Sequence, residues 1–386
     1  MRILLVSDEP RDASMGGPKV ALKLQAGLQG LGHTCEALFR PELGARPRSP
    51  RLRMAAAPWL ARRAAAERSR HAGRYDVIDA ASAEGWMMAP GAARVVVARS
   101  HGLEHRYYQE LLADARAGLL HKPWGRRLWY PAVRLTQVRQ ALRRARRVIV
   151  LSQADREWVL ARGWQAAERI EVIPHGVDGA RWQQAPAPNA ERGAGVLFCG
   201  WWTTSKGVAY LAQAYRLLLE RGVRAPLTLL GVGVGDASWP QLEARVRAAF
   251  VPAAQPLLRL LPRVHDEAAV FAEYRRHDLL ICPSTSEGFG LVVVEALSQR
   301  LPVVCCQGVG AAELLRHERE ALLAPARDAG ALAAALEELW RHPERRRALG
   351  EAGRERVREL SWEAIAARTA ACYQRALGAA AAAAGR

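Results

Sequence analysis

Two glutamates, eight residues apart, carry the clearest chemical signal in this sequence. They lie in the segment Pro283-Ser-Thr-Ser-Glu287-Gly-Phe-Gly-Leu-Val-Val-Val-Glu295-Ala. The apolar run that ends at Cys282 predicts a buried strand, and we expect a helix to begin near Phe289. A helix N-terminus at the carboxyl end of a parallel strand binds phosphate, because its free N–H groups and its dipole attract anions. Glu287 and Glu295 can accept hydrogen bonds from sugar or ribose hydroxyls, although a single glutamate at a helix start is more often only stabilised by the dipole.

Other motifs for catalysis or metal binding are missing from the sequence. There is no P-loop, no DxD acid pair, no HExxH, no GxSxG and no paired Cys/His nucleophile. The glycines of Gly231–Gly235 do not complete a dinucleotide fingerprint, and we interpret them as a strand-to-loop turn. We therefore expect a site that needs no metal ion.

The composition describes a globular chain. Its 386 residues predict two or three domains, and a hydrophobic content of 50% excludes collagen-like, fibrous and wholly disordered classes. No run of about 20 apolar residues occurs, so no membrane span is expected. The start turns acidic at Asp8 too early for a signal peptide and is expected to form a first strand. The six cysteines lack metal-ligand spacing, which indicates buried, reduced thiols in a cytoplasm.

The net charge is +18, from 56 basic and 38 acidic side chains, and it should attract phosphates, anionic headgroups or acidic polymers. The excess is densest in Arg40–Arg74, where arginines mix with Met54, Trp59 and Leu60, and again in Arg139–Arg147. The first segment suits an anionic membrane surface or an acidic glycan, and an ordinary solvated helix is an equal alternative. We do not expect nucleic acid as a partner, because no nucleic-acid motif accompanies the basic residues.

Apolar runs alternate with helical patterns along the chain, which predicts an α/β protein with parallel sheets covered by helices on both faces. Gly16-Gly17 is expected in a loop before a helix over Val20–Leu31. The predicted strands are Ile3–Ser7, Val77–Asp79, Val95–Ala98, Val148–Leu151, Ile170–Ile173, Val196–Cys199, Leu227–Leu230, Leu257–Leu260, Leu279–Cys282 and Pro302–Cys305. Breakers in 185–193 mark a linker. The expected parts are a first domain (1–184), the linker (185–193), a second domain (194–360), a closing helix that packs back on the first domain (361–378) and a frayed tail (379–386).

The Glu287–Glu295 segment resembles the Glu-x7-Glu motif of glycosyltransferase family 4, whose members are retaining enzymes of the GT-B fold that use nucleotide-sugar donors. Other matching segments extend the resemblance over nearly the whole chain. They are Gly16-Gly17, Ser100-His101-Gly102, Val172–Asp178, Phe198–Gly207, Gly308–Glu313 and Leu360-Ser-Trp362. The resemblance implies two Rossmann-like domains that face a central cleft, with the acceptor bound by the first domain and the nucleotide sugar by the second.

The resemblance also implies roles for matching residues. Lys206 would hold the donor diphosphate, because a cation there opposes the charge that develops on the departing phosphate. Glu287 would contact the transferred sugar or the phosphate region, and Glu295 the ribose hydroxyls. His101 would bind a sugar hydroxyl from the opposite domain. A solvated Lys206 and a structural His101 are the alternatives.

Donor binding would further involve the backbone of Gly290 and Leu291, with Phe289 beside them. Gly16 and Gly17 would approach the diphosphate where a side chain would collide. The remaining histidines of interest, His175, His265 and His277, are expected to be structural. The resemblance implies front-face displacement, in which the leaving phosphate helps to deprotonate the acceptor.

Three positions depart from the family pattern. Trp201 stands where the family usually has arginine, which removes one phosphate-binding cation. His175 replaces the usual asparagine, and Pro262 stands where glycine is common. Two other classes therefore stay open: a non-catalytic nucleotide-sugar-binding protein of the same fold, or a GT-B epimerase or phosphorylase.

The function expected from these observations is a retaining, metal-independent hexosyltransferase. It would move a hexose-type sugar from a UDP or GDP sugar to a glycan or lipid-linked acceptor, in cell-surface polysaccharide or glycolipid synthesis, with no cofactor besides that co-substrate. We expect it in the cytoplasm, peripheral on the inner face of the cytoplasmic membrane.

Overall fold

The computed structural model describes residues 1–386 apart from 46, 89–92, 120–123, 188–189, 234–237 and 385–386. The chain divides into two compact units. The first unit comprises Met1–Arg106, His121–His175 and Trp362–Arg386, and the second comprises Tyr107–Leu120 and Gly176–Ser361.

Two segments lie in a different unit from the one expected. The first domain was expected to end at residue 184, whereas the chain from Gly176 belongs to the second unit, where the Val177 N–H donates to the Leu360 carbonyl at 2.7 Å. Tyr107–Leu120 also belongs to the second unit, because Arg327 forms an ion pair with Asp114 at 3.0 Å.

The first unit is built on a parallel sheet. Its six described strands have the order β2-β1-β3-β4-β5-β6. They are β1 (Arg2–Val6), β2 (Thr34–Leu38), β3 (Tyr75–Ala81), β4 (Ala93–Arg99), β5 (Arg147–Val150) and β6 (Ile170–Val172). The chain leaves β1 toward β2 on one side and returns to β3 on the other. The carboxyl ends of β1 and β3 therefore flank a topological switch point, where ligands bind in open α/β sheets.

The second unit repeats this plan. Its six described strands have the order β12-β11-β10-β7-β8-β9, all parallel. They are β7 (Val196–Cys199), β8 (Leu227–Leu230), β9 (Leu258–Leu261), β10 (Leu279–Cys282), β11 (Val303–Cys306) and β12 (Leu322–Ala324). The strand order reverses between β7 and β10, so the second switch point lies at the carboxyl ends of these two strands.

Helices alternate with the strands in both units. In the first unit they are α1 (Gly16–Gly30), α2 (Pro50–Ala72), α4 (Trp124–Tyr130), α5 (Thr136–Arg144), α6 (Gln153–Ala161) and α14 (Trp362–Ala384), and α3 spans Glu104–Arg116. In the second unit they are α7 (Gly179–Gln183), α8 (Val208–Glu220), α9 (Trp239–Ala248), α10 (Glu267–Arg276), α11 (Leu291–Ser298), α12 (Ala329–Arg341) and α13 (Pro343–Arg356). Short 3-10 turns include η1 (Arg40–Leu43), η2 (Ser82–Met87), η5 (Thr204–Lys206) and η7 (Gly310–Leu314).

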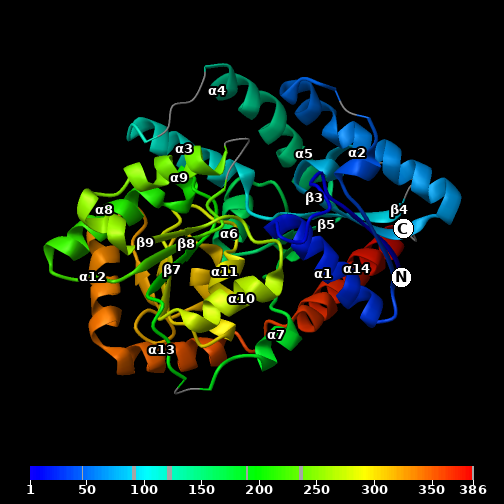
Figure 1. The fold of residues 1–386 in the computed structure, drawn as a ribbon. Coiled ribbons are helices and arrows are strands. Elements are labelled where there is room, and N and C mark those ends of the chain that lie inside the picture. The colour runs from blue at the N-terminus through cyan, green and yellow to red at the C-terminus, as the bar shows by residue number, and fades with distance from the viewer. Residues whose placement is uncertain (46, 89–92, 120–123, 188–189, 234–237, 385–386) are drawn as a thin grey trace. The chain divides into compact units, whose positions relative to one another are not determined.

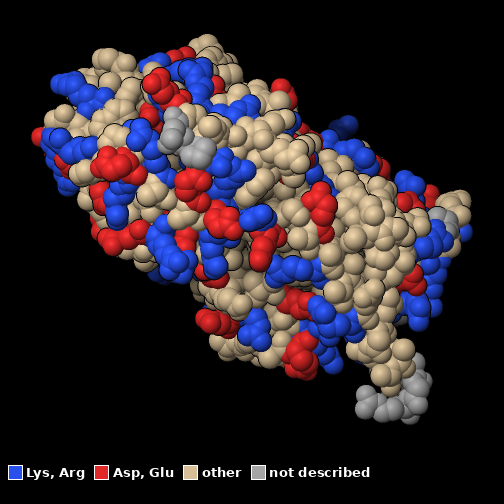
Figure 2. Space-filling model, turned by 90° about the horizontal axis from the view of Figure 1, so that it is seen from below, with Lys and Arg blue, Asp and Glu red and all other residues tan. Residues whose placement is uncertain are grey.

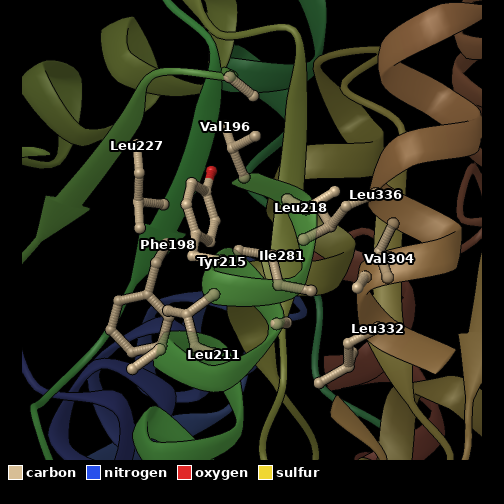
Figure 3. Packing of buried hydrophobic residues seen from close by; sticks show 14 of the residues in the cluster. Val196, Phe198, Leu211, Tyr215, Leu218, Leu227, Ile281, Val304, Leu332 and Leu336 are labelled. Carbon is tan, nitrogen blue, oxygen red and sulfur yellow. The ribbon is translucent and has the colours of Figure 1, made fainter. Parts of the chain in front are cut away.

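The core of the second unit explains why the sequence of each of its strands is a continuous apolar run. Side chains from β7, β8, β10 and β11 converge with those of α8 and α12 (Figure 3). Phe198, Leu211 and Leu332 are at most 1% exposed. A parallel sheet covered on both faces needs apolar residues on both sides of each strand, which explains the pattern.

Helix α1, near the N-terminus, and helix α14, near the C-terminus, lie side by side in the first unit (Figure 1). A Cβ on Gly27 would lie 2.7 Å from the Ala366 Cβ, so the glycine permits this close approach. Two expectations about these helices were wrong. Gly16 and Gly17 form the first turn of α1 rather than a loop before it. Residues 379–384 are helical rather than frayed, since alanine has the highest helix propensity.

On the face that Figure 2 shows, Lys and Arg side chains are interspersed with Asp and Glu side chains. The excess of basic residues is spread over this face. All six cysteines are free thiols, as expected, and Cys199 is the one that is not fully buried. None of the described helices is long and apolar enough to cross a membrane.

Candidate active site

Lys206 and Glu287 meet at the switch point of the second sheet. The Lys206 ammonium donates to Glu287 Oε1 at 2.5 Å. Lys206 follows β7 and Glu287 follows β10, and these strands are neighbours in the sheet. The fold therefore brings together a cation and a carboxylate from two distant segments of the chain. These are the two residues for which the family resemblance implies roles at the donor phosphate.

The pair is held on both sides. Ser284 Oγ donates to the other carboxylate oxygen, Glu287 Oε2, at 2.9 Å, and the Cys282 thiol lies 3.8 Å from the same oxygen. The Lys206 side chain is 25% exposed and that of Glu287 16%. Burial disfavours the charged amine, but the charge and hydrogen bond of Glu287, together with the nearby Cys282 and Cys199, raise the pKa of Lys206 above its ordinary value. Lys206 thus stays cationic over the whole physiological range.

The backbone locks the loops that carry this pair. The Thr285 N–H donates to the Ser205 carbonyl at 2.9 Å, which ties the loop after β10 to the loop after β7. Gly207 has φ +68°, and a Cβ there would lie 1.8 Å from the Pro283 carbonyl oxygen. Only glycine permits both this left-handed backbone and this contact.

A third loop, after β11, closes on the same place. The Gly310 N–H donates to the Glu287 carbonyl at 3.2 Å. A Cβ on Gly310 would lie 2.2 Å from the Gly288 carbonyl oxygen. Gly290, at φ +91°, then turns the chain into α11. The glycines expected to serve ligand binding therefore also serve close packing between backbones.

Glu295 lies in the second turn of α11 and is 5% exposed. Its Oε2 accepts a hydrogen bond of 3.0 Å from the Tyr274 hydroxyl of α10. Burial and the neighbouring acidic groups raise the pKa of Tyr274 well above its ordinary value, so the phenol stays a donor. Phe289 is buried at 3% exposure, and Gly290 beside it is buried as well.

The two tryptophans after β7 differ. Trp202 is buried and packs against Phe250, with ring centroids 5.8 Å apart. Trp201 is 42% exposed. The position at which arginine was expected therefore presents an indole to solvent, in the same loop as Lys206.

His101 follows β4 in the first unit and is half-buried. Burial, reinforced by the positive charge of Arg99, lowers the pKa of His101 to about 4. Arg99 in turn donates to Asp79 at 2.7 and 2.9 Å, and the Tyr373 hydroxyl of α14 donates to the same carboxylate at 2.5 Å. His101 is therefore a neutral imidazole at physiological pH.

His101 lines a pocket of about 560 Å³ at the switch point of the first sheet. Its wall combines the ends of β1 and β3 with parts of η1, η2, α2, α3 and α4. The lining residues are Ser7, Asp8, Glu9, Arg40, Pro50, Arg53, Met54, Ala81, Glu84, His101, Glu104, Tyr130 and Arg134. A hollow of this size suits a small polar ligand.

Arg134 organises one end of this pocket. It forms ion pairs with Glu84 at 3.2 Å and with Glu104 at 2.8 Å. The Tyr130 hydroxyl donates to Glu104 at 2.8 Å. Burial raises the pKa of Glu84 even though Arg134 opposes the shift.

Glu9 also lines this pocket, in the loop after β1. Its Oε2 is buried and accepts no hydrogen bond from the described residues. A Cβ on Gly17 would lie 1.9 Å from that oxygen, whereas a Cβ on Gly16 would meet nothing within 4 Å. The lack of a side chain at Gly17 therefore leaves room for the Glu9 carboxylate.

Comparison with known proteins places these observations in a family. A model described as "Glycosyltransferase Family 4" matches residues 16–181, and one described as "Glycosyl transferases group 1" matches residues 193–342. The chain belongs to glycosyltransferase family 4. The family and the GT-B fold expected from the sequence are thereby confirmed.

Several family relatives and solved structures are similar to this chain. D-inositol 3-phosphate glycosyltransferase of Pseudarthrobacter chlorophenolicus is 32% identical over 54% of this chain, which spans about half (51%) of that relative. Sucrose-phosphate synthase from Thermosynechococcus elongatus has a TM-score of 0.75 at 22% identity, covering 98% of this chain and 99% of that one. Anabaena HepE in complex with UDP-glucose has a TM-score of 0.68 at 18% identity, covering 97% and 100%.

For this family 4 chain, the roles assigned to individual residues stay predictions, but their places are now known. Lys206, Glu287, Phe289, Gly290, Leu291 and Glu295 belong to the second unit, and Gly16, Gly17 and His101 to the first. Sequence reasoning missed Ser284, Tyr274, Glu9 and the Arg134 cluster. Glu9 could have been found, because it lies in the loop after a predicted strand, as Glu287 does.

No group of three or more His, Cys, Asp or Glu side chains in the described residues is arranged to hold a metal ion.

Proposed function

We propose that this chain is a retaining glycosyltransferase that moves a hexose-type sugar from a UDP or GDP sugar to a glycan or lipid-linked acceptor. The observation that carries the proposal is the Lys206–Glu287 pair, held at 2.5 Å by backbone-locked loops at a switch point. Family membership supports it, as does the likeness to HepE, whose structure contains UDP-glucose.

Each group would have a distinct task. The Lys206 ammonium has three donors, so it can keep Glu287 as a partner and still bind an oxygen of the leaving diphosphate. In front-face displacement, the bond from the anomeric carbon to the phosphate oxygen breaks and a bond to the acceptor oxygen forms on the same face. The acceptor hydroxyl proton passes to the departing phosphate, so no protein nucleophile is needed. Neutral His101 would hold a sugar hydroxyl.

The test is nucleotide release from a panel of UDP-, GDP- and ADP-sugars without added metal. We expect slow hydrolysis of one donor, lowered about 100-fold or more in Lys206→Ala and Glu287→Ala. Arg216→Ala is the matched control, since it removes an exposed ion pair with Glu220 at 2.7 Å in the helix after the Lys206 loop. Normal release by both site variants would refute the assignment.

A second candidate is a non-catalytic nucleotide-sugar-binding protein, which the exposed Trp201 favours. It would bind one donor of the panel without releasing free nucleotide from it. Recovery of release in Trp201→Arg would identify the missing cation as the cause.

We also propose that Arg40–Arg74 contacts an anionic membrane surface, which would place the enzyme on the inner face of the cytoplasmic membrane in polysaccharide or glycolipid synthesis. Helix α2 exposes Leu52 (59%) and Trp59 (50%) among arginines. Leu60, which the sequence assigned to this surface, is instead buried at 3% exposure.

Co-sedimentation with anionic vesicles at low and high salt tests the membrane proposal. The double variant Leu52→Glu, Trp59→Glu should abolish binding, and Leu31→Glu, at an exposed leucine in the turn after α1, should not. Absence of binding at every salt concentration would exclude it.

A further inference from the structure

A network of buried charges lies behind His101, entirely within the first unit. Arg99, at the end of β4, donates to Asp79 Oδ2 of β3 through Nε at 2.9 Å and through Nη2 at 2.7 Å. The Tyr373 hydroxyl of α14 donates to the same oxygen at 2.5 Å. Arg99, Asp79 and Tyr373 are at most 4% exposed. One guanidinium is therefore held in a fixed place with little contact to solvent.

Two nitrogen atoms beside this network have no hydrogen-bond partner among the described residues. They are Arg99 Nη1 and His101 Nδ1, and both atoms are buried. Arg99, Asp79 and His101 line a hollow of about 20 Å³ that α1 and the strands β1 to β4 enclose. A hollow of this size holds one water, which can accept from Arg99 Nη1 and donate to His101 Nδ1. Such a chain of hydrogen bonds requires a lone pair, and no proton, on Nδ1.

The charges around His101 favour the same arrangement. A proton on Nδ1 would add positive charge beside the Arg99 cation at a site of low dielectric, whereas a lone pair is attracted by that cation. Burial and the charge of Arg99 together lower the pKa of His101, in agreement with this direction. Asp79 does not act as an acceptor for Nδ1, because its Oδ2 already receives three hydrogen bonds from Arg99 and Tyr373, and Nδ1 bonds to none of the described residues.

A second imidazole packs against His101 and leaves this arrangement unchanged. The ring centroids of His101 and His175 are 5.8 Å apart, and their planes are inclined by 36°. Burial, together with the charges of His101 and Arg99, lowers the pKa of His175 well below its ordinary value. His175 is therefore also neutral at physiological pH and adds no charge beside His101.

We propose that Arg99 is a positioning residue that keeps Nδ1 of His101 without a proton and thereby fixes the proton on Nε2. His101 then offers an N–H donor, and no acceptor, to its ligand. For the identity of that ligand we rely on the proposed function, in which His101 holds a sugar hydroxyl. The oxygen of that hydroxyl must accept the hydrogen bond. Since Tyr373 holds Asp79, helix α14 from the far end of the sequence contributes to the state of His101.

Nitrogen NMR on the full chain with isotope-labelled histidine tests the tautomer without any ligand or turnover. The signals of His101 are identified by their loss in His101→Asn. At neutral pH we expect a protonated Nε2 and a bare Nδ1. An Nδ1-protonated share as large as that of free histidine, or larger, would overturn the proposal.

A double variant separates the electrostatic role of Arg99 from a structural one. Arg99→Gln with Asp79→Asn removes both charges together, so no unpaired charge stays buried. We expect the Nδ1-protonated share of His101 to rise about tenfold. The matched control is Arg147→Gln with Glu171→Gln, which removes an ion pair of 3.0 Å between the neighbouring strands β5 and β6 of the same sheet and should leave the share unchanged. An equal share in the two double variants would show that Arg99 has no such role.

Tyr373→Phe decides the question if the double variant does not fold. It keeps both charges and frees one lone pair of Asp79 Oδ2, which can then accept from a protonated Nδ1. We expect the Nδ1-protonated share to rise about twofold. In that case an unchanged share would overturn the proposal.

Sugar analogues test the consequence for the ligand. Fluorine in place of a hydroxyl accepts a weak hydrogen bond but donates none, and hydrogen in its place does neither. Calorimetry with fluoro and deoxy forms of the nucleotide sugar should show, at one hydroxyl, a ratio of fluoro to deoxy affinity about threefold higher in the unaltered chain than in His101→Ala. Equal ratios at every hydroxyl would show that His101 offers no donor to the sugar. Nucleotide release from ordinary donors decides the proposed function separately, and the tautomer is measured whether or not any donor is turned over.

Discussion

The two switch points of this molecule are built in opposite ways. In the second unit, Lys206 and Glu287 satisfy each other, and their positions follow from backbone contacts between three loops. In the first unit, the pocket is assembled from side chains of strands, helices and turns, and Glu9 Oε2 in it accepts no hydrogen bond from the described residues. A site set by backbone geometry tolerates few substitutions, whereas a pocket lined by side chains can change its ligand by single substitutions.

In the proposed function, this contrast separates the site for the donor from the site for the acceptor. Lys206 would hold the donor diphosphate from a rigid frame. The pocket of the first unit is lined by side chains, so single substitutions there can change the ligand that it selects.

The largest expected effect comes from a substitution in the Lys206 loop of the second unit. Gly207→Ala would place a Cβ 1.8 Å from the Pro283 carbonyl oxygen, so the Lys206 loop must move away from Glu287. We expect a loss of about 3 kcal/mol or more in the free energy of unfolding and about a 100-fold loss of nucleotide release.

The control is Gly222→Ala. Gly222 has a similar φ of +76° but open space around its Cβ, so only the left-handed strain of about 1 kcal/mol applies. Equal melting temperatures of the two variants would show that the loop contact is not the cause.

The second prediction concerns stability in acid, to which His101 of the first unit contributes. His101 is neutral in the folded chain with a pKa of about 4, against 6.5 unfolded, so the unfolded state binds more protons below pH 6.5. The stability from this group is complete above pH 6.5 and is lost as pH falls toward 4, by about 2 kcal/mol at pH 5. Urea unfolding at pH 7 and pH 5 should therefore show a smaller acid loss for His101→Asn than for the unaltered chain. His317→Asn, at an exposed imidazole, should leave the acid loss unchanged.

A third prediction sharpens the role of the glycine pair. Gly17→Ala should displace the flexible Glu9 side chain and lower the free energy of unfolding by about 1 kcal/mol, measured by urea unfolding. Gly16→Ala meets open space and should not lower it. If both variants instead lose donor hydrolysis, the pair serves the diphosphate, as the family resemblance implies.

The smallest expected effect concerns Glu295. Tyr274→Phe removes the 3.0 Å hydrogen bond to its buried carboxylate and should cost about 1 kcal/mol in thermal or urea unfolding. If Glu295 also binds ribose, the Michaelis constant for the donor should rise while turnover stays the same. A variant with unchanged stability and unchanged donor kinetics would show that the hydrogen bond has no such part.

Most strands could be predicted, because buried parallel strands are short apolar runs between breakers. The two that were not predicted, β2 and β12, each lie at the edge of a sheet. Glu36 interrupts the apolar pattern of β2, and β12 has three residues, too few for a pattern. The sequence also could not show that Gly16 and Gly17 begin α1, since glycine is a poor helix former and their helical state depends on the packing around them.

The sequence by itself determined the family, the α/β class and the residues of the second switch point, because these depend on local patterns: a strand, a glycine loop, a helix start. Only the tertiary structure decided which of these residues touch. It placed Glu9 against Gly17 and enclosed Glu84 with Arg134. Such contacts join residues far apart in the chain, and their pairing depends on strand order and on the space between side chains, which no local pattern records.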